Sequence, residues 1–173
     1  MTSQSTSIEA LLSRLTQEST SYYIEEKSIS TRETIDGHTF YSRFKKYEGR
    51  VSQTLIAQHI NKTITLAVPL EKDSLLFEYS GEHMVVFVNL LFHLAKEFGI
   101  DTLTITMYNF DKIIVYLPAF EYNSNIIEEF LEKVEKLLDL KLPEQWQILP
   151  RKNIPEIGNL LQLPREVIEL DSF

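Results

Sequence analysis

Residues 74–98, SLLFEYSGEHMVVFVNLLFHLAKEF, are the segment of the sequence most informative about the fold class. Residues 74–79 form a short apolar run with the length of a buried strand, and Gly81 ends it. Residues 83–98 are apolar on nearly every side of a helix, which predicts a helix deep in the core, and Gly99 is typical of a helix C-terminus. A buried strand followed by a buried helix predicts a domain in which helices pack on a sheet.

Before and after this segment, apolar periodicity and turn residues predict further helices and strands. Strands separated by helices around a central hairpin predict an α+β fold. No linker or internal repeat interrupts the sequence, so we expect a single domain over 1–173. The expected elements, in chain order, are a helix over 7–18, strands over 22–25 and 39–44, a helix over 52–60, strands over 63–68 and 74–79, a helix over 83–98, strands over 102–108 and 112–117, a helix over 124–139, a strand-like segment after 143 and a strand over 159–163.

Composition restricts the class of protein. The 173 residues are 43% apolar and 24% charged, an ordinary globular mixture. With no cysteine, the chain has neither disulfides, nor thiolate metal sites, nor a cysteine nucleophile. The net charge of −8 counts against DNA binding as a main task but is compatible with a local basic face. Residues 1–10 do not resemble a signal peptide, and the most apolar window, 84–95, is too short to span a bilayer; we expect a cytoplasmic protein that binds no membrane.

Motifs for catalysis are sparse. No pair of histidines has the spacing of a helical metal site, so no metal is expected, and a histidine in the apolar helix, His93, is interpreted as a partly buried core residue. Two-metal nucleotidyl transfer needs clustered carboxylates, as in a D-x-D pair on one face of a strand. The corresponding place is Glu78-Tyr79-Ser80, where a single acid is left. The four histidines are His38, His59, His83 and His93.

One stretch joins cations to aromatic rings. Residues 40–47, FYSRFKKY, have the composition of a surface that binds single-stranded nucleic acid, on which bases stack and phosphates pair with cations. The candidate binding residues are Tyr41, Arg43, Lys45 and Lys46. The simpler interpretation, which we favour, is a solvated edge strand that its lysines protect from pairing.

The order of these elements resembles that of archaeo-eukaryotic-type primases, and most closely the bacterial primase-polymerase (prim-pol) branch of conflict-system elements. The resemblance covers about 52–164, leaving residues 1–51 as an N-terminal helix and extension. It rests on 54–70, TLIAQHINKTITLAVPL, followed by the strand at 74–80; on QILP at 147–150; and, most specifically, on GNLLQLP at 158–164. It implies a prim-pol-like α+β fold, a mixed sheet with packed helices, or a small bacterial family with a degenerate form of that fold.

The departures from this family concern its active site. The metal-binding D-x-D reads Glu78-Tyr79-Ser80, and the phosphate-binding S-G-x-G-x-H is replaced by MYNFDK at 107–112. The position of the family's third acidic residue is occupied by Gln145 or its neighbour Trp146. The resemblance therefore implies a primase-type fold with a dismantled active site.

Three hypotheses about function follow. The first is a non-catalytic prim-pol-like module, without cofactor, that binds a protein partner or single-stranded nucleic acid. The second is a divergent nucleotidyltransferase that uses Mg²⁺ or Mn²⁺, in which Glu78 and the remnant position Ser80 are joined by Glu82 or by Asp111 of the hairpin. The third is a structural homo-oligomer subunit that associates through the apolar helix at 83–98.

Overall fold

The structure is a computed structural model that describes residues 7–109, 111–143 and 145–168. Its contacts divide the chain into two compact units: unit 1 comprises Met1–Glu71 and Pro150–Val167, and unit 2 comprises Lys72–Leu149 and Ile168–Phe173. Unit 1 has 11 basic and 10 acidic residues, whereas unit 2 has 6 and 15, so the net negative charge belongs to unit 2. That the two units form one domain stays a prediction.

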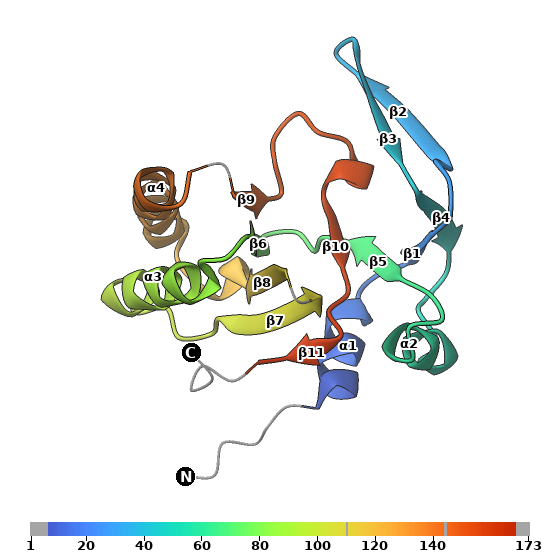
Figure 1. The fold of residues 1–173 in the computed structure, drawn as a ribbon, viewed down its shortest axis with the longest axis horizontal. Coiled ribbons are helices and arrows are strands. Elements are labelled where there is room, and N and C mark those ends of the chain that lie inside the picture. Colours follow the sequence, from blue (N-terminus) through green and yellow to red (C-terminus); the bar gives the residue numbers. More distant parts are fainter. Residues whose placement is uncertain (1–6, 110, 144, 169–173) are drawn as a thin grey trace. The chain divides into compact units, whose positions relative to one another are not determined.

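Unit 1 is built on an antiparallel sheet with the strand order β10-β5-β1-β4 (Figure 1). Its helices α1 and α2 each begin at a serine, Ser7 or Ser52, whose hydroxyl accepts a backbone N–H of the first turn. The elements are α1 (Ile8–Thr16), β1 (Ser21–Glu25), β2 (Thr31–Ile35), β3 (His38–Ser42), β4 (Phe44–Glu48), α2 (Gln53–Ile60), β5 (Leu66–Pro69), the 3₁₀ turn η2 (Glu156–Gly158), β10 (Leu160–Gln162) and β11 (Glu166–Val167).

Strands β2 and β3 form a two-stranded hairpin, residues 31–42, that we call the arm (Figure 1). It continues the β1–β4 ladder past an irregularity, where Glu26 donates its backbone N–H to the carbonyl of Arg43. Asp36 and Gly37 close the arm with φ of 48° and 78°. Two consecutive residues with positive φ are what the two-residue hairpin turn requires, and Asp-Gly is a strong sequence signal for it.

The segment that resembles the primase family most specifically, 158–164, has local packing and hydrogen-bonding roles in unit 1. A Cβ on Gly158 would lie 2.3 Å from Cγ2 of Ile154, so only glycine fits beside that side chain. The Asn159 carboxamide accepts the backbone N–H of Arg151 at 2.8 Å and donates to its carbonyl at 3.0 Å. This loop positions β10, whose residues are largely buried.

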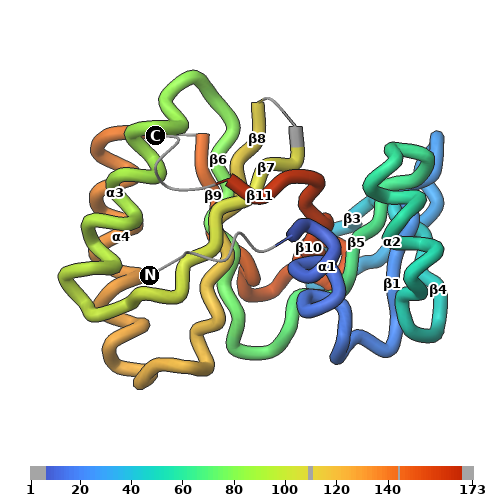
Figure 2. Tube along the Cα trace, turned by 90° about the horizontal axis from the view of Figure 1, so that it is seen from below, coloured from blue at the N-terminus to red at the C-terminus, as the bar shows by residue number. Residues whose placement is uncertain are grey.

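Unit 2 consists of an antiparallel sheet with two helices on one of its faces, as Figures 1 and 2 show. Within the unit the strand order is β7-β8-β6-β9. The elements are β6 (Leu75–Ser80), α3 (Met84–Glu97), β7 (Thr104–Asn109), β8 (Lys112–Leu117), the 3₁₀ turn η1 (Ala119–Glu121), α4 (Ser124–Lys141) and β9 (Trp146–Leu149).

The core of unit 2 lies between this sheet and the helices. Alternate residues of β6, Phe77 and Tyr79, point towards the helices: Tyr79 stacks on Phe87 of α3, and Phe77 makes an edge contact with Phe130 of α4. Glu78 and Ser80, between and after them, therefore belong to the opposite face of the sheet.

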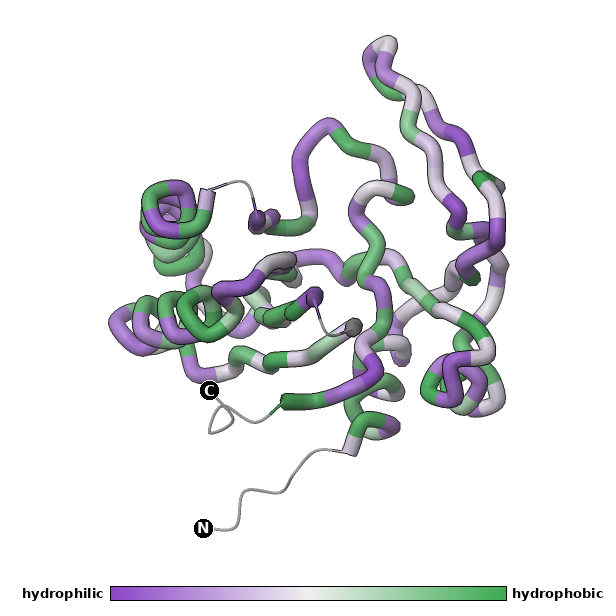
Figure 3. Tube along the Cα trace, in the orientation of Figure 1, coloured by the Kyte–Doolittle hydropathy of each residue, from purple (hydrophilic) through white to green (hydrophobic). Residues whose placement is uncertain are grey.

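The structure confirms the predicted α+β class: four α-helices and antiparallel sheets occur within the described residues. The expectation that the helix at 83–98 is buried on nearly every side is wrong, because Val85 and Val86 are 48% and 44% exposed. His93, interpreted as a core residue, has a side chain that is 76% exposed and pairs with Glu97 one turn later. The outward side of α3 still carries apolar residues, and Figure 3 colours much of this helix as hydrophobic.

Within the described part of the chain, no helix has the length and hydropathy of a membrane span.

Candidate functional site

The remnant position of the metal site lies in the middle of unit 2. Glu78 is on β6, between β8 and β9, and its cross-strand neighbour on β9 is Gln147. Ser80, two residues later, lies opposite Lys112 of β8. Because directly opposed residues share a face of an antiparallel sheet, these four side chains gather on the face away from the helices.

The Glu78 carboxylate is held by two donors. Lys112 Nζ lies 3.1 Å from Oε2, and the carboxamide of Gln147 donates a hydrogen bond to the same oxygen. Glu78 is only 4% exposed, and a carboxylate so deeply buried is stable only when it is paired and hydrogen-bonded. The protein itself therefore supplies the positive charge that neutralises Glu78.

A polar hollow of about 280 Å³ opens above this pair, lined by Glu78, Ser80, Lys112, Gln145, Trp146 and Gln147. One wall is fixed by Gln145, whose side-chain oxygen accepts the hydroxyl of Tyr79 at 2.7 Å and whose carbonyl accepts the backbone N–H of Ser80. A Cβ on Gly81 would lie 2.7 Å from both the Gln145 oxygen and the Tyr79 hydroxyl, so glycine allows the wall to close.

The acids expected to join Glu78 do not line this hollow. Glu82 and Asp111 are exposed, and neither is among the described residues that surround the hollow. The position of the family's third acid holds Gln145 and Trp146, which bring no carboxylate. Among the described residues, no three histidine, aspartate or glutamate side chains come together as a metal ion would require.

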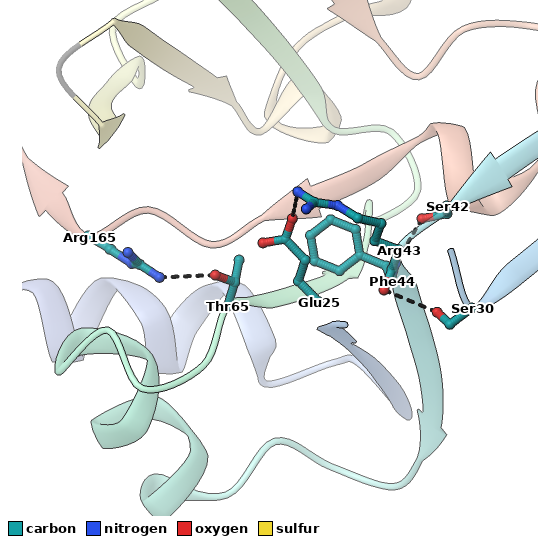
Figure 4. A network of polar contacts seen from close by, with 7 residues as sticks. All are labelled: Glu25, Ser30, Ser42, Arg43, Phe44, Thr65 and Arg165. Carbon is teal, nitrogen blue, oxygen red and sulfur yellow. Dashed lines mark hydrogen bonds and ion pairs between the residues drawn. The ribbon is translucent and has the colours of Figure 1, made fainter. Parts of the chain in front are cut away.

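Two of the four cations and rings proposed for nucleic-acid binding serve the fold of unit 1. The guanidinium of Arg43 pairs with Glu25 of β1 (Figure 4). Lys46 Nζ lies 3.1 Å from the carboxylate of Glu156, which also accepts the hydroxyl of Tyr23. The first contact connects the residue just before β4 to β1, and the second connects β4 to the 3₁₀ turn η2.

Tyr23, Lys46 and Glu156 form a hydrogen-bonded cluster in which the pKa of each side chain is shifted. Burial raises the pKa of the Tyr23 hydroxyl, and the hydrogen bond to Glu156 raises it further. Burial opposes ionisation of Glu156, but the hydrogen bonds from Tyr23 and Lys46 outweigh it, so the pKa of this carboxyl is lowered. The pKa of Lys46 is raised, first by its hydrogen bond to Glu156. At neutral pH the cluster therefore contains an ionised carboxylate held by a cation and a phenol.

The other two candidates remain accessible, each beside a second side chain. Tyr41 is 60% exposed on the arm, and the guanidinium carbon of Arg32, its directly opposed neighbour, lies 5.8 Å from the centre of its ring. Lys45 Nζ lies 5.6 Å from the ring centre of Tyr47. Arg32 was not among the predicted site residues; within the described part of the chain it is ion-paired with no carboxylate, so its N–H donors face solvent.

His59, one of the four histidines of the chain, is fully buried where α2 meets β5. Its Nδ1 accepts the backbone N–H of Leu66 at 3.1 Å, which leaves Nε2 to donate to the carbonyl of Pro164 at 3.2 Å. Burial lowers the pKa of His59, so the ring is neutral at physiological pH. Both nitrogens are occupied by backbone groups, and this histidine connects elements of unit 1.

A family model described as a domain of unknown function (DUF1882) matches residues 9–75, less than half of the chain. The match extends from α1 to the first residue of β6. It includes the arm with Arg32 and Tyr41 and ends before Glu78. None of the curated proteins compared with the chain matches it.

Proposed function

We propose that the chain is a non-catalytic, prim-pol-like binding module that binds single-stranded nucleic acid through the arm. The observation that supports a non-catalytic role is the state of Glu78. Its carboxylate already has a cation, Lys112, and an amide donor, Gln147, and the described residues that line the hollow add no second acid. Two-metal catalysis needs several free carboxylates, and the described residues of this site offer none besides Glu78.

The prim-pol-like part of the proposal is supported by the order of the elements. A helix and a strand over 53–69 precede the strand with Glu78, and a long helix and a hairpin follow it. The competing function, a nucleotidyltransferase centred on Glu78, has less support, because the acids it would recruit, Glu82 and Asp111, are exposed outside the hollow.

The binding role is supported by the Arg32–Tyr41 pair. The ring of Tyr41 is exposed for stacking, and a base that stacks on an aromatic side chain contributes about 1–3 kcal/mol. The guanidinium of Arg32 carries a fork of donors that matches a phosphate, and no carboxylate of the described residues occupies it. The overall charge of −8 opposes this role only weakly, since unit 1, which carries the arm, is close to neutral.

The test is fluorescence anisotropy of a labelled oligothymidine at low salt. Wild type should bind, and Tyr41→Ala should weaken binding by roughly fivefold to a hundredfold, the equivalent of one lost stacking contact. Arg32→Ala should weaken binding and reduce its salt dependence, because it removes a phosphate contact. The matched control is Phe120→Ala in unit 2, which removes an aromatic ring that is 55% exposed and should change nothing.

Two results would contradict the proposal. If wild type does not bind the oligonucleotide at low salt, the nucleic-acid role is wrong and a protein partner becomes the binding hypothesis. If Phe120→Ala weakens binding as much as Tyr41→Ala does, the arm is not the binding surface.

A further inference from the structure

The outward side of α3 in unit 2 carries a stripe of exposed residues, within which His93 pairs with Glu97 and Phe92 packs partly against the core of the unit. The exposed side chains are Glu82, just before the helix, and Val85, Val86, Asn89, His93 and Lys96, with Phe92 half-buried among them. Exposed valines in two adjacent positions are unusual on a solvated helix, whose outward residues are normally polar. The stripe therefore has the composition of a contact surface.

This stripe is self-complementary around Asn89. Val86 and Phe92 lie three positions on either side of it, and Val85 and His93 lie four positions away. In a two-fold interface each residue i meets residue j of the other copy, and j meets i. If two α3 helices pair antiparallel with Asn89 at the axis, the valines of one copy meet the rings of the other.

The charges at the two ends of the stripe follow the same symmetry. Glu82 lies just before the first turn of α3 and Lys96 lies in its last turn, so an antiparallel pair brings the end that carries Glu82 to the end of the second copy that carries Lys96. Within the described residues neither has an ion-pair partner, in contrast to Glu97, which pairs with Lys133 at 2.7 Å. A symmetric pair would form this contact twice.

The shape of the surface also suits a second copy. Two hollows that share Asn89 and His93 flank the stripe: one of about 410 Å³ between Val86 and Leu137 of α4, and one of about 540 Å³ beside Phe92. Apolar side chains of a partner helix can fill them. The acidic row of α4 does not approach this surface, because at the helical period it lies on the other side of α4 from Leu137. That row consists of Glu128, Glu132, Glu135 and Asp139.

We propose that the chain forms a symmetric homodimer by antiparallel pairing of α3 across Asn89, with two reciprocal contacts between Glu82 and Lys96. The inference concerns unit 2 alone and is independent of the role of the arm.

The first experiment is sedimentation velocity of the full chain from low-micromolar to near-millimolar concentration. Wild type should show a reversible monomer–dimer equilibrium. Glu82→Lys and Lys96→Glu should each weaken the dimer at least about fivefold, because each reversal turns two attractive pairs into two repulsive ones. An equimolar mixture of these two variants should recover wild-type affinity, since the heterodimer restores both pairs.

The second experiment uses the absence of cysteine in the chain. Asn89→Cys places a single thiol at the proposed axis, where the two copies bring it within reach of its symmetry mate. Under mild oxidation it should form a disulfide-linked dimer much faster than the control Glu132→Cys, on the acidic side of α4. A wild type that stays monomeric throughout, a mixture no tighter than the single variants, or equal cross-linking of both cysteines would overturn the proposal.

Discussion

Replacing Lys112 with methionine removes the cation that neutralises Glu78 while keeping most of the volume of the side chain. Breaking a buried ion pair typically costs about 3–5 kcal/mol, because the remaining charge stays buried. The side chain of Lys112 is 25% exposed, so water can reach part of the site and reduce this cost. We expect a loss of about 2 kcal/mol in the free energy of unfolding, or about 4–8 °C in Tm for a chain of this size.

The assay is urea unfolding at neutral pH, followed by circular dichroism and repeated by calorimetry. The matched control is Lys136→Met, whose ion pair with Glu132 spans 3.7 Å with both side chains at least 75% exposed. Such a surface pair contributes well under about 1 kcal/mol. Adding Glu78→Gln to Lys112→Met should recover part of the loss, because the buried charge is then gone. If Lys112→Met is no more destabilising than Lys136→Met, Lys112 does not hold Glu78 and the argument from this ion pair is refuted.

Three further changes have expected outcomes in unit 1. Burial lowers the pKa of His59, so the stability that the neutral ring provides is complete above its unfolded pKa of about 6.5. At lower pH the free energy of unfolding should decrease by up to about 1.4 kcal/mol per pH unit. His59→Asn should remove this contribution from urea midpoints measured between pH 7.5 and 5, and an unchanged pH dependence would contradict the assignment. Gly158→Ala forces a methyl group to within 2.3 Å of Ile154 and should lower the free energy of unfolding by about 1–3 kcal/mol. At Gly49, by contrast, the space is open, and the positive φ is the obstacle to an alanine. A Gly158→Ala variant as stable as wild type in calorimetry would refute the packing argument. Gly37→Val, with φ at 78°, should disorder the arm, seen as loss of amide protection at 31–42 in hydrogen exchange, and full protection would contradict the turn assignment.

The elements of regular length and pattern could be predicted from the sequence. The amphipathic helix at 124–139 and the strand at 112–117 occur as α4 and β8, since their apolar residues face one core. The arm was only partly predicted: a strand was expected near 39–44, but its partner β2 was missed. Asp36-Gly37 was the available signal, because that dipeptide is typical of a two-residue hairpin turn.

The candidate site was predicted less completely than the fold. Glu78 was found through its strand, but its partners Lys112 and Gln147 come from two other strands, and only the sheet register brings the three together. The sequence does not single out Arg32 for the same reason, since only strand pairing places it opposite Tyr41 across the arm. Composition marks a residue's chemistry, whereas strand pairing decides which residues meet.

The exposed side of α3 shows a different limit. A helix that is apolar on nearly every side predicts complete burial, because hydropathy alone does not distinguish a core from an interface between chains. Val85 and Val86 are nevertheless exposed, and their pattern around Asn89 becomes informative only once the buried side of the helix is known.

We infer that the charge of Glu78 is neutralised by Lys112 inside the protein and that Glu78 does not serve as a metal ligand in a nucleotidyltransferase. The most direct measurement is Mn²⁺ titration followed by electron paramagnetic resonance, in which bound Mn²⁺ loses the signal of the free ion. We expect wild type and Glu78→Gln to leave the same amount of free Mn²⁺, with and without a nucleoside triphosphate. A stoichiometric loss of free Mn²⁺ in wild type that Glu78→Gln abolishes would contradict it.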